Sequence, residues 1–319
     1  MQTVKALAIA LLALAAGGAL AQQYPDRPVR FIAGYPPGSA SDNLARILAH
    51  KMTEVWGQQV IVDNRPGAAG NIAAETTAKA APDGYTILLV ATNHAIVSSL
   101  YKKLPFHPIN DFAPITHVSS APAILVTHPS LPVKNVAEFV KLAKTKPGQL
   151  NYGSSGNGAT PHLAMELLKS TVGIDLIHVP YKGIPPAMTD LLAGQIQAMF
   201  STMAPAMPLV RAARLRALAV TSPQRSPAAP DVPTMSETIP GFEATSWQGV
   251  LAPAGTPPAV VQKVNETILK IIKMPDVHQR LIDGGYIPAG TTSPAFAAFI
   301  KSEMVKWAKV VKAAGATLD

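Results

Sequence analysis

Residues 34–42 read Gly34-Tyr35-Pro36-Pro37-Gly38-Ser39-Ala40-Ser41-Asp42 and directly follow the apolar run 29–33. The run predicts a strand, the Pro-Pro-Gly sequence ends it, and the serines or the aspartate can cap a helix that begins at once. A helix start leaves backbone N–H groups without partners and carries a partial positive charge. The stretch therefore predicts an anion-binding loop, whose candidate contacts are Tyr35, Pro37, Gly38, Ser39, Ser41 and Asp42.

A second stretch repeats this design far downstream. Residues 151–162 contain a short strand, three glycines, Thr160 as the expected cap and Pro161 at the first helical position. We expect the two loops to face each other across a cleft and to hold one carboxylate between them. The second loop contributes the candidates Ser154, Ser155, Gly156, Gly158, Ala159, Thr160 and His162.

The second loop also resembles three known motifs, and it fulfils none of them. Ala159 stands where a phosphate-binding loop needs Lys, and Pro161 stands where a dinucleotide fingerprint needs its third Gly. Neither Ser154 nor Ser155 has the flanking glycines of a serine-hydrolase elbow. The backbone donors of an anion-binding loop remain, with an ordinary tight strand-to-helix turn as the alternative.

The order of elements predicts an α/β fold with two lobes. Residues 29–91 alternate strand, helix, strand, helix, strand, and the carboxyl ends of such strands form a binding crevice, which adds Asn93 to the candidates. Residues 112–127 predict a crossing into a second lobe, and residues 247–253 predict the return. We expect each lobe to be a mostly parallel sheet flanked by helices, with 22–122 plus 247–319 in lobe 1 and 123–246 in lobe 2.

Two more candidates follow strands of the second lobe. Tyr181 comes after a strand that ends at Val179, and Ser201 comes after the run 198–200. Each can contact a ligand or simply pack at the surface. Trp247, on the return crossing, is better explained as hinge packing than as a ligand contact.

Composition excludes several classes of function. The chain has no Cys, which excludes disulfides and thiolate metal sites, and its eight His are too dispersed for a metal site. The formal charge is +8, but no basic run occurs, so we expect steering of small anions and no nucleic-acid partner. We predict no catalytic residues, no metal and no cofactor.

The N-terminal segment predicts export. Residues 1–21 combine Lys5, an apolar stretch and Ala19-Leu20-Ala21, which is typical of a signal peptide cut before Gln22. Because Gln22 is not Cys, we expect no lipid anchor. No later stretch has the length of a membrane span. The mature protein is therefore expected to be periplasmic and soluble.

Several motifs together resemble the Bug family, the periplasmic solute-binding receptors of tripartite tricarboxylate transporters. The resemblance covers essentially the whole mature chain. Its motifs are Pro-Pro-Gly-Ser-x-x-Asp at 36–42, the Asn-Arg-Pro-Gly-Ala-x-Gly sequence at 64–70, Pro-Asp-Gly-Tyr at 82–85, the 153–163 loop, Val-Pro-Tyr-Lys-Gly at 179–183 and Trp-x-Gly-x-x-Ala-Pro-Ala-Gly-Thr-Pro at 247–257.

The resemblance implies a two-lobed type II periplasmic-binding-protein fold, the Venus flytrap, in which two loops grip a ligand carboxylate. Ser39 stands where many members have Gly, and Ser201 stands where some carry an acid, so an amino-acid ligand is less favoured. The implied function is a monomeric receptor that delivers a small organic carboxylate to inner-membrane transporter subunits. An exported serine hydrolase and a receptor-like module that signals through a sensor partner are the alternatives. The identity of the carboxylate stays open.

Overall fold

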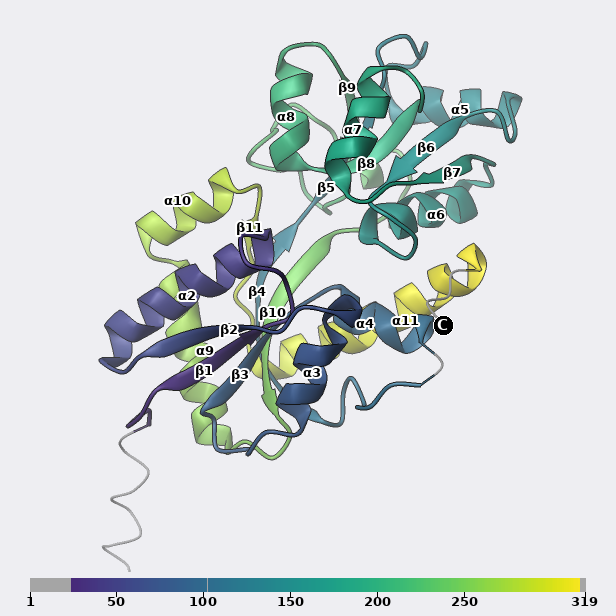
Figure 1. The fold of residues 1–319 in the computed structure, drawn as a ribbon. Helices are drawn as coiled ribbons and strands as arrows, with labels where there is room; N and C mark the ends of the chain where they lie inside the picture. The colour runs from purple at the N-terminus through teal and green to yellow at the C-terminus, as the bar shows by residue number, and fades with distance from the viewer. Residues whose placement is uncertain (1–23, 102, 316–319) are drawn as a thin grey trace, which may run out of the picture.

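A computed structural model describes residues 24–101 and 103–315. This part of the chain forms two β-sheets, each with helices on both faces, one in the lower and one in the upper half of Figure 1. The expected signal peptide lies outside the described residues. None of the helices within the described ranges is long and apolar enough to cross a membrane.

The six-stranded sheet defines lobe 1 and has the strand order β11-β4-β10-β3-β1-β2. Strand β1 pairs in parallel with β2 and β3, while β10 is antiparallel to both β3 and β4. The strands are β1 (Val29–Ala33), β2 (Val60–Asn64), β3 (Thr86–Ala91), β4 (Phe112–Ala121), β10 (Ser246–Pro253) and β11 (Ile287–Pro288).

Helices cover both faces of this sheet. Successive strand residues point to opposite faces, so Phe31 packs with one group of helices and Ile32 with the other. The Phe31 face carries α2 (Ala40–Trp56), α9 (Pro258–Ile272) and α10 (Pro275–Asp283). The Ile32 face carries α3 (Asn71–Ala78), α4 (Asn93–Leu100) and α11 (Ser293–Ala314).

The five-stranded sheet defines lobe 2 and has the order β7-β6-β8-β5-β9, with β5 antiparallel to both neighbours. Its strands are β5 (Ala123–Thr127), β6 (Asn151–Ser154), β7 (Ile177–Pro180), β8 (Ala198–Thr202) and β9 (Arg216–Val220). Helices α5 (Val136–Thr145) and α6 (Thr160–Val172) pack on one face, and α7 (Ile184–Leu192) and α8 (Met203–Arg211) pack on the other.

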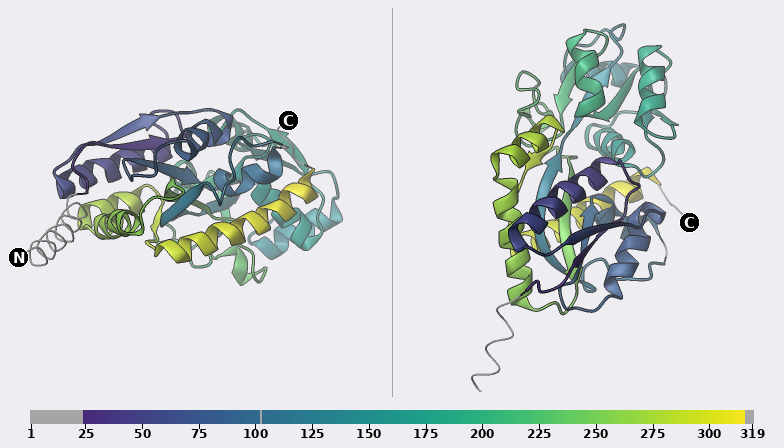
Figure 2. Two further views of the ribbon diagram at one scale, coloured as in Figure 1. Left: turned by 90° about the horizontal axis from the view of Figure 1, so that it is seen from below. Right: turned by 60° about the vertical axis from the view of Figure 1, so that its left-hand side comes forward.

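The chain passes between the sheets twice. Strand β4 ends at Ala121 and β5 begins at Ala123, so only Pro122 separates the two sheets on the outward path. The return path runs through the proline-rich segment 221–245, which contains one short 3₁₀ turn (Met235–Glu237). The turned view in the right panel of Figure 2 shows one sheet above the other along the long axis of the molecule.

Helix α11 packs against α4 in lobe 1 and against α6 in lobe 2. It is the long yellow helix at the bottom of the left panel of Figure 2. Trp307, Val310 and Val311 of this helix belong to a buried apolar cluster that also includes Leu163 of α6 and Ile96 of α4. One continuous core therefore joins the two lobes on this side.

The predicted α/β fold is confirmed, with both sheets mixed in strand direction. The sequence analysis missed two helices, α4 and α8, which start directly after strands β3 and β8. It also described residues 247–253 as a crossing, whereas they form the central strand β10. Thr160 is not a cap: it is the first residue of α6, and Ala159 occupies the N-cap position.

Candidate functional site

A cleft lies between the two lobes and consists of three adjoining cavities. Their volumes are about 280, 290 and 190 Å³. We call them the outer, middle and inner cavities in that order. Asn93 lines all three, and Ala121, Pro122 and Ser246 of the two crossings line the outer and middle ones. The cleft therefore sits against the two segments that connect the lobes.

The two predicted loops line this one cleft. Tyr35 and Ser41 of the first loop line the outer cavity. Ser155, Ala159 and Thr160 of the second loop line the middle cavity, and Thr160 lines the outer cavity as well. The loops come from different lobes, so a ligand between them would contact both.

Three helices begin at the cleft without a side-chain cap. Helix α4 starts after Thr92, α6 after Ala159 and α8 after Thr202, and each of these N-cap residues lines the outer or the middle cavity. None of the three has an acidic residue in its first turn. Their free N–H groups and positive ends therefore face one space, which favours a bound anion.

No formally charged side chain lines the three cavities within the described residues. Hydroxyl and amide groups line them instead, from Tyr35, Ser41, Thr92, Asn93, Ser155, Asn157, Thr160, Ser201, Thr202, Ser246, Gln248 and Tyr286. The cleft can therefore hold an anion only through helix ends, backbone N–H groups and neutral donors.

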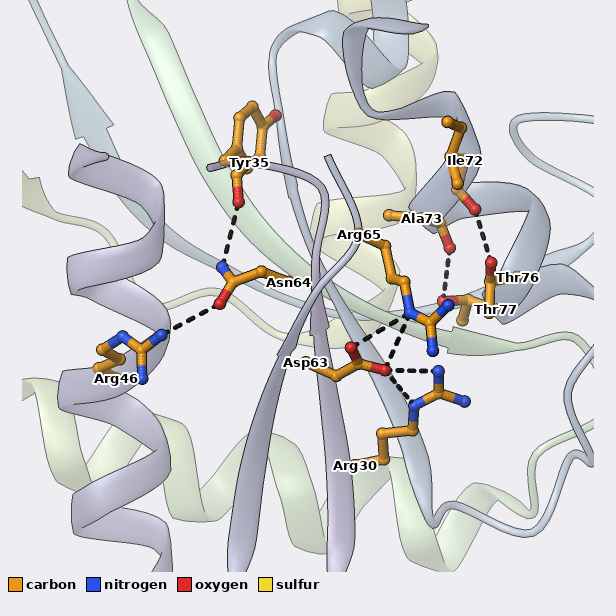
Figure 3. Close-up of polar contacts among 10 residues, drawn as sticks. All are labelled: Arg30, Tyr35, Arg46, Asp63, Asn64, Arg65, Ile72, Ala73, Thr76 and Thr77. Carbon is orange, nitrogen blue, oxygen red and sulfur yellow. Dashed lines mark hydrogen bonds and ion pairs between the residues drawn. The ribbon is translucent and has the colours of Figure 1, made fainter. Parts of the chain in front are cut away.

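A polar network behind the cleft fixes the first loop, and Figure 3 shows part of it. The Asn64 side chain donates to the Tyr35 carbonyl at 3.1 Å and to Asp42 Oδ1 at 2.8 Å. Arg46 donates to Asn64 Oδ1 at 3.0 Å and to Asp42 Oδ2 at 3.0 Å. The N–H of Gly38 also donates to Asp42 Oδ2, at 2.8 Å. Asn64 and Arg46, which were not candidate contacts in the sequence analysis, thus position the first loop through Tyr35 and Asp42.

The electrostatics of this network keep Asp42 ionised. Burial alone would raise the pKa of Asp42, but hydrogen bonds from Arg46, Asn64 and the Gly38 N–H together lower it. The side chain of Asp42 is 2% exposed, and that of Arg46 is 52% exposed. In addition, Ser39 caps α2 by accepting from the Asp42 N–H at 3.2 Å. Unlike α4, α6 and α8, helix α2 is therefore capped and charge-compensated.

Histidines fix the second loop from behind. His162 Nδ1 accepts from the Gly158 N–H at 3.1 Å, which requires this nitrogen to be unprotonated. The ring of His178 stacks on His162 with centroids 4.0 Å apart, and its Nε2 lies 2.6 Å from Ser154 Oγ. Burial lowers the pKa of His178 to about 4, helped by repulsion from His162, and burial also lowers the pKa of His162. Both rings are therefore neutral near pH 7.

Several predicted contacts lie away from the cavity walls. Pro37, Gly38, Ser39 and Asp42 do not line any of the three cavities, and Ser154 and His162 are buried beneath the second loop. Tyr181 also lies outside the lining and donates to Asp190 at 2.6 Å. The predicted residues that do line the cleft are Tyr35, Ser41, Asn93, Ser155, Gly156, Gly158, Ala159, Thr160 and Ser201.

Trp247 is a packed residue beside the return connection and does not line the cleft. It is 1% exposed, and its ring contacts His117, Phe296 and Phe299. Its indole N–H donates to Glu303 Oε2 at 3.0 Å, and the indole of Trp307 donates to the same oxygen at 2.8 Å. This buried carboxylate therefore ties β10 to α11 beside the crossing.

The sequence analysis missed Ser246, Gln248 and Tyr286, which all line the cleft. Thr92 follows the end of β3 and Thr202 ends β8, and each lies directly before a helix that the sequence analysis did not predict and lines the cleft as well. Gln248 lies next to the predicted hinge Trp247 and carried no separate signal. Within residues 24–101 and 103–315, no group of three or more His, Asp or Glu side chains could hold a metal ion.

Two lobes around a cleft lined by uncapped helix starts are typical of the class of two-lobed solute-binding receptors. Comparison with known proteins makes this assignment specific. The chain matches the tripartite tricarboxylate transporter family receptor over residues 44–316, and it belongs to this family. The resemblance to the Bug receptors is thereby confirmed.

Relatives cover almost the whole chain. Protein BugT of Bordetella pertussis is 36% identical over 301 residues, covering 93% of this chain and 92% of BugT. The structure of R. palustris Rpa4515 with adipate is 35% identical, with a TM-score of 0.77 and coverage of 92% and 100% of the two chains. MatC from Rhodopseudomonas palustris with bound malate is 30% identical, with a TM-score of 0.73 and coverage of 90% and 100%.

Proposed function

We propose that this receptor captures a small organic carboxylate in the cleft between its lobes and delivers it to the membrane subunits of a transporter. The observation that carries the proposal is the convergence of three uncapped helix starts on a cleft without charged side chains. The adipate and malate bound by two relatives support the same ligand class. A micromolar complex requires about 8 kcal/mol, which four or five hydrogen bonds of about 1.5–3 kcal/mol each can supply after ordering costs.

The proposal keeps the predicted division of the chain. Lobe 1 comprises residues 22–122 and 247–319, and lobe 2 comprises residues 123–246. The change of sheet at Pro122 and the start of β10 at Ser246 support these boundaries. Closure of the lobes by hinge motion at these segments would bring Ser41 and Ser155 against the same ligand. The proposed location is the periplasm, after removal of residues 1–21 and without a lipid anchor, and the proposed state is a monomer.

The hydrolase alternative requires a reactive Ser in the second loop, where Ser154 Oγ lies 2.6 Å from His178 Nε2. Ser154 is 0% exposed, and no acidic side chain in the described ranges hydrogen-bonds to His178. A buried hydroxyl cannot reach an ester or amide substrate. The family is a family of receptors, which also disfavours the hydrolase. The signalling alternative would use the same cleft, so only the identity of the partner distinguishes a receptor that serves a sensor from one that serves a transporter.

The sharpest test converts the α6 start into a self-capped helix. In Ala159→Asp, the new carboxylate occupies an N-cap position whose backbone already has the required φ of −69° and ψ of 154°. We expect the ligand-free protein to become more stable by about 1 kcal/mol, because the cap satisfies the free N–H groups. The same carboxylate competes with the ligand, so affinity for carboxylates falls at least about tenfold.

Ala159→Ser is the matched control, because it caps the helix without adding charge. Calorimetric titration with a panel of carboxylates and urea unfolding measure both effects on the three proteins. Equal carboxylate affinity in the wild type and Ala159→Asp would contradict the proposed site. Ester turnover by the wild type that disappears in Ser155→Ala would favour the hydrolase.

A further inference from the structure

The inner cavity has a different wall from the other two cavities. Asn93, Ser155 and Ala159 line both the middle and the inner cavity, so they mark the boundary between the two. Beyond this boundary, four aliphatic side chains contribute to the lining, namely Ala69, Ile96, Val97 and Leu100. None of these four lines the outer or the middle cavity. The wall of the cleft therefore changes from mainly polar to mainly aliphatic at this boundary.

Helix α4 provides both kinds of surface. Its first residue, Asn93, lines all three cavities, and Ile96, Val97 and Leu100 follow at the spacing that places side chains on one face of a helix. The three aliphatic side chains are at most 5% exposed, so packing on their other sides holds them in place. One face of α4 thus leads from the polar helix start into the inner cavity, where it forms a fixed apolar floor.

The second loop adds few free hydrogen-bond donors to the inner cavity. The Gly156 N–H donates to Ser154 Oγ at 3.1 Å, and the Gly158 N–H donates to His162 Nδ1 at 3.1 Å. Among the described residues, Asn157 is the only polar side chain that lines this cavity alone, and it is exposed. A ligand group in this cavity is therefore met mainly by carbon atoms.

The inner cavity has the size of a small hydrocarbon group. Its volume is about 190 Å³, whereas an apolar cavity of about 150 Å³ is already large enough to bind benzene. It adjoins the middle cavity at Ala159, the N-cap residue of α6. A group attached to a carboxylate at this helix start can therefore enter the inner cavity.

We infer that the inner cavity binds an apolar part of the ligand, an alkyl chain or an aromatic ring of about six carbons, against the α4 face formed by Ile96, Val97 and Leu100. The ligand class is then a carboxylate with an apolar substituent. This inference rests on the proposed function, since it assumes that the carboxylate lies at the helix starts. The outer cavity stays free for a further polar group.

A series of acids tests the inference. Titration calorimetry, direct or by displacement, compares straight-chain acids from acetate to decanoate. We expect affinity to rise by about three- to fivefold for each methylene group that enters the cavity, because burial of one such group contributes about 0.8 kcal/mol, and to level off once the cavity is full. Phenylacetate or 3-phenylpropionate should bind at least about tenfold more tightly than acetate for the same reason.

Two variants of opposite size assign this dependence to the inner cavity. Val97→Ala enlarges the cavity, so the chain length at which affinity levels off should rise by about one or two carbons. Val97→Ile adds one methyl group to the same wall, so this length should fall by about one carbon. Val305→Ala is the matched control, because Val305 is 60% exposed on α11, and it should keep the wild-type profile. Thermal melts show that each variant is folded.

The outcomes separate the two proposals. If acetate and the longer acids bind equally, or if both Val97 variants keep the wild-type profile, the inference is wrong while the carboxylate receptor stands. The same holds if none of these acids binds but other carboxylates do. If no carboxylate of any kind binds to the wild type, the proposed function is wrong and the inference falls with it.

Discussion

Replacing Asp42 by Asn tests whether a buried charge holds the first loop. The substitution keeps the shape of the side chain and removes its charge. Asp42 accepts from the Gly38 N–H at 2.8 Å, from Arg46 Nε at 3.0 Å and from Asn64 Nδ2 at 2.8 Å. An Asn has only one acceptor oxygen, so at least one of the three donors must face an NH₂ group.

The expected cost follows from these contacts. The least damaging orientation keeps the oxygen towards Gly38 and Arg46 and turns the NH₂ towards Asn64. One hydrogen bond to a charged acceptor is then lost, at about 1.5–3 kcal/mol, and the two remaining bonds weaken because the acceptor is neutral. We expect the free energy of unfolding at pH 7 to fall by about 2–4 kcal/mol, with Arg46 adding little because it is half exposed.

The pH dependence provides an independent check. The pKa of Asp42 is lower in the folded chain than its usual value. Its contribution to stability is therefore fully present above the unfolded pKa of about 3.9 and is lost as the pH falls through the lower folded value. The stability difference between the wild type and Asp42→Asn should be constant from pH 7 to about pH 5 and should shrink below about pH 4.

Urea unfolding monitored by tryptophan fluorescence over this pH range measures the effect. Asp276→Asn is the control, because Asp276 forms only a surface ion pair with Lys51 and its side chain is 55% exposed. Asp276→Asn should change stability far less than Asp42→Asn. Equal, small effects of the two substitutions would refute the role of Asp42 as the anchor of the first loop.

Three further predictions concern the second loop and the hinge. Acid should loosen the second loop, because the pKa of His178 is lowered to about 4 in the folded chain. The contribution of His178 to stability is fully present above its unfolded pKa of about 6.5 and is lost as the pH falls towards 4, and ligand affinity should fall with it. A flat affinity profile from pH 7 to 4 would contradict this prediction. Gly249→Ala places a Cβ 2.1 Å from the ring of Phe296, so unfolding should become easier by about 1–3 kcal/mol or more in thermal melts, and an unchanged melting temperature would show that the ring can move. Glu303→Ala leaves the buried indole N–H groups of Trp247 and Trp307 without their acceptor, so the free energy of unfolding in urea should fall by about 2–5 kcal/mol. Glu303→Gln keeps an acceptor oxygen and should lower it less. A larger loss in Glu303→Gln than in Glu303→Ala would contradict this role of the carboxylate.

The fold was largely predictable because its signals are local. The Pro-Pro-Gly turn after β1, the apolar run of β3 and the glycine-rich loop after β6 each mark a strand that leads into a turn or helix. Helices α4 and α8 escaped because they follow their strands with almost no loop. Helix α8 also contains Pro205 and Pro208, which lower helix propensity and favour reading the segment as a turn.

The cleft was predictable only in part, because its walls combine distant segments. The loops at Tyr35 and Ser155 carry glycine and serine patterns that indicate helix starts, and both line the cleft. Gln248 lies on the antiparallel strand β10, and its orientation depends on Ser119 of β4, which pairs with it across the sheet. Such a pairing depends on strand register between residues far apart in sequence, and no single stretch reveals it.

The direction in which a side chain points cannot be read from a single stretch of sequence either, and this explains why two buried residues were predicted as ligand contacts. Asp42 and His162 lie beside helix starts and have polar side chains, so the sequence favoured them as ligand contacts. In the folded chain they satisfy backbone N–H groups of Gly38 and Gly158. A polar side chain four residues after a glycine can equally serve the loop or the ligand, and only the direction of the side chain distinguishes the two.

The position of α11 has a consequence for how the protein melts. This last helix is embedded in the apolar cluster that spans α4 and α6, so the two halves of the molecule share one buried cluster in addition to the cluster that each has of its own. Heat or denaturant should therefore unfold both halves in a single cooperative transition, although the cleft lets them move relative to each other in the native state.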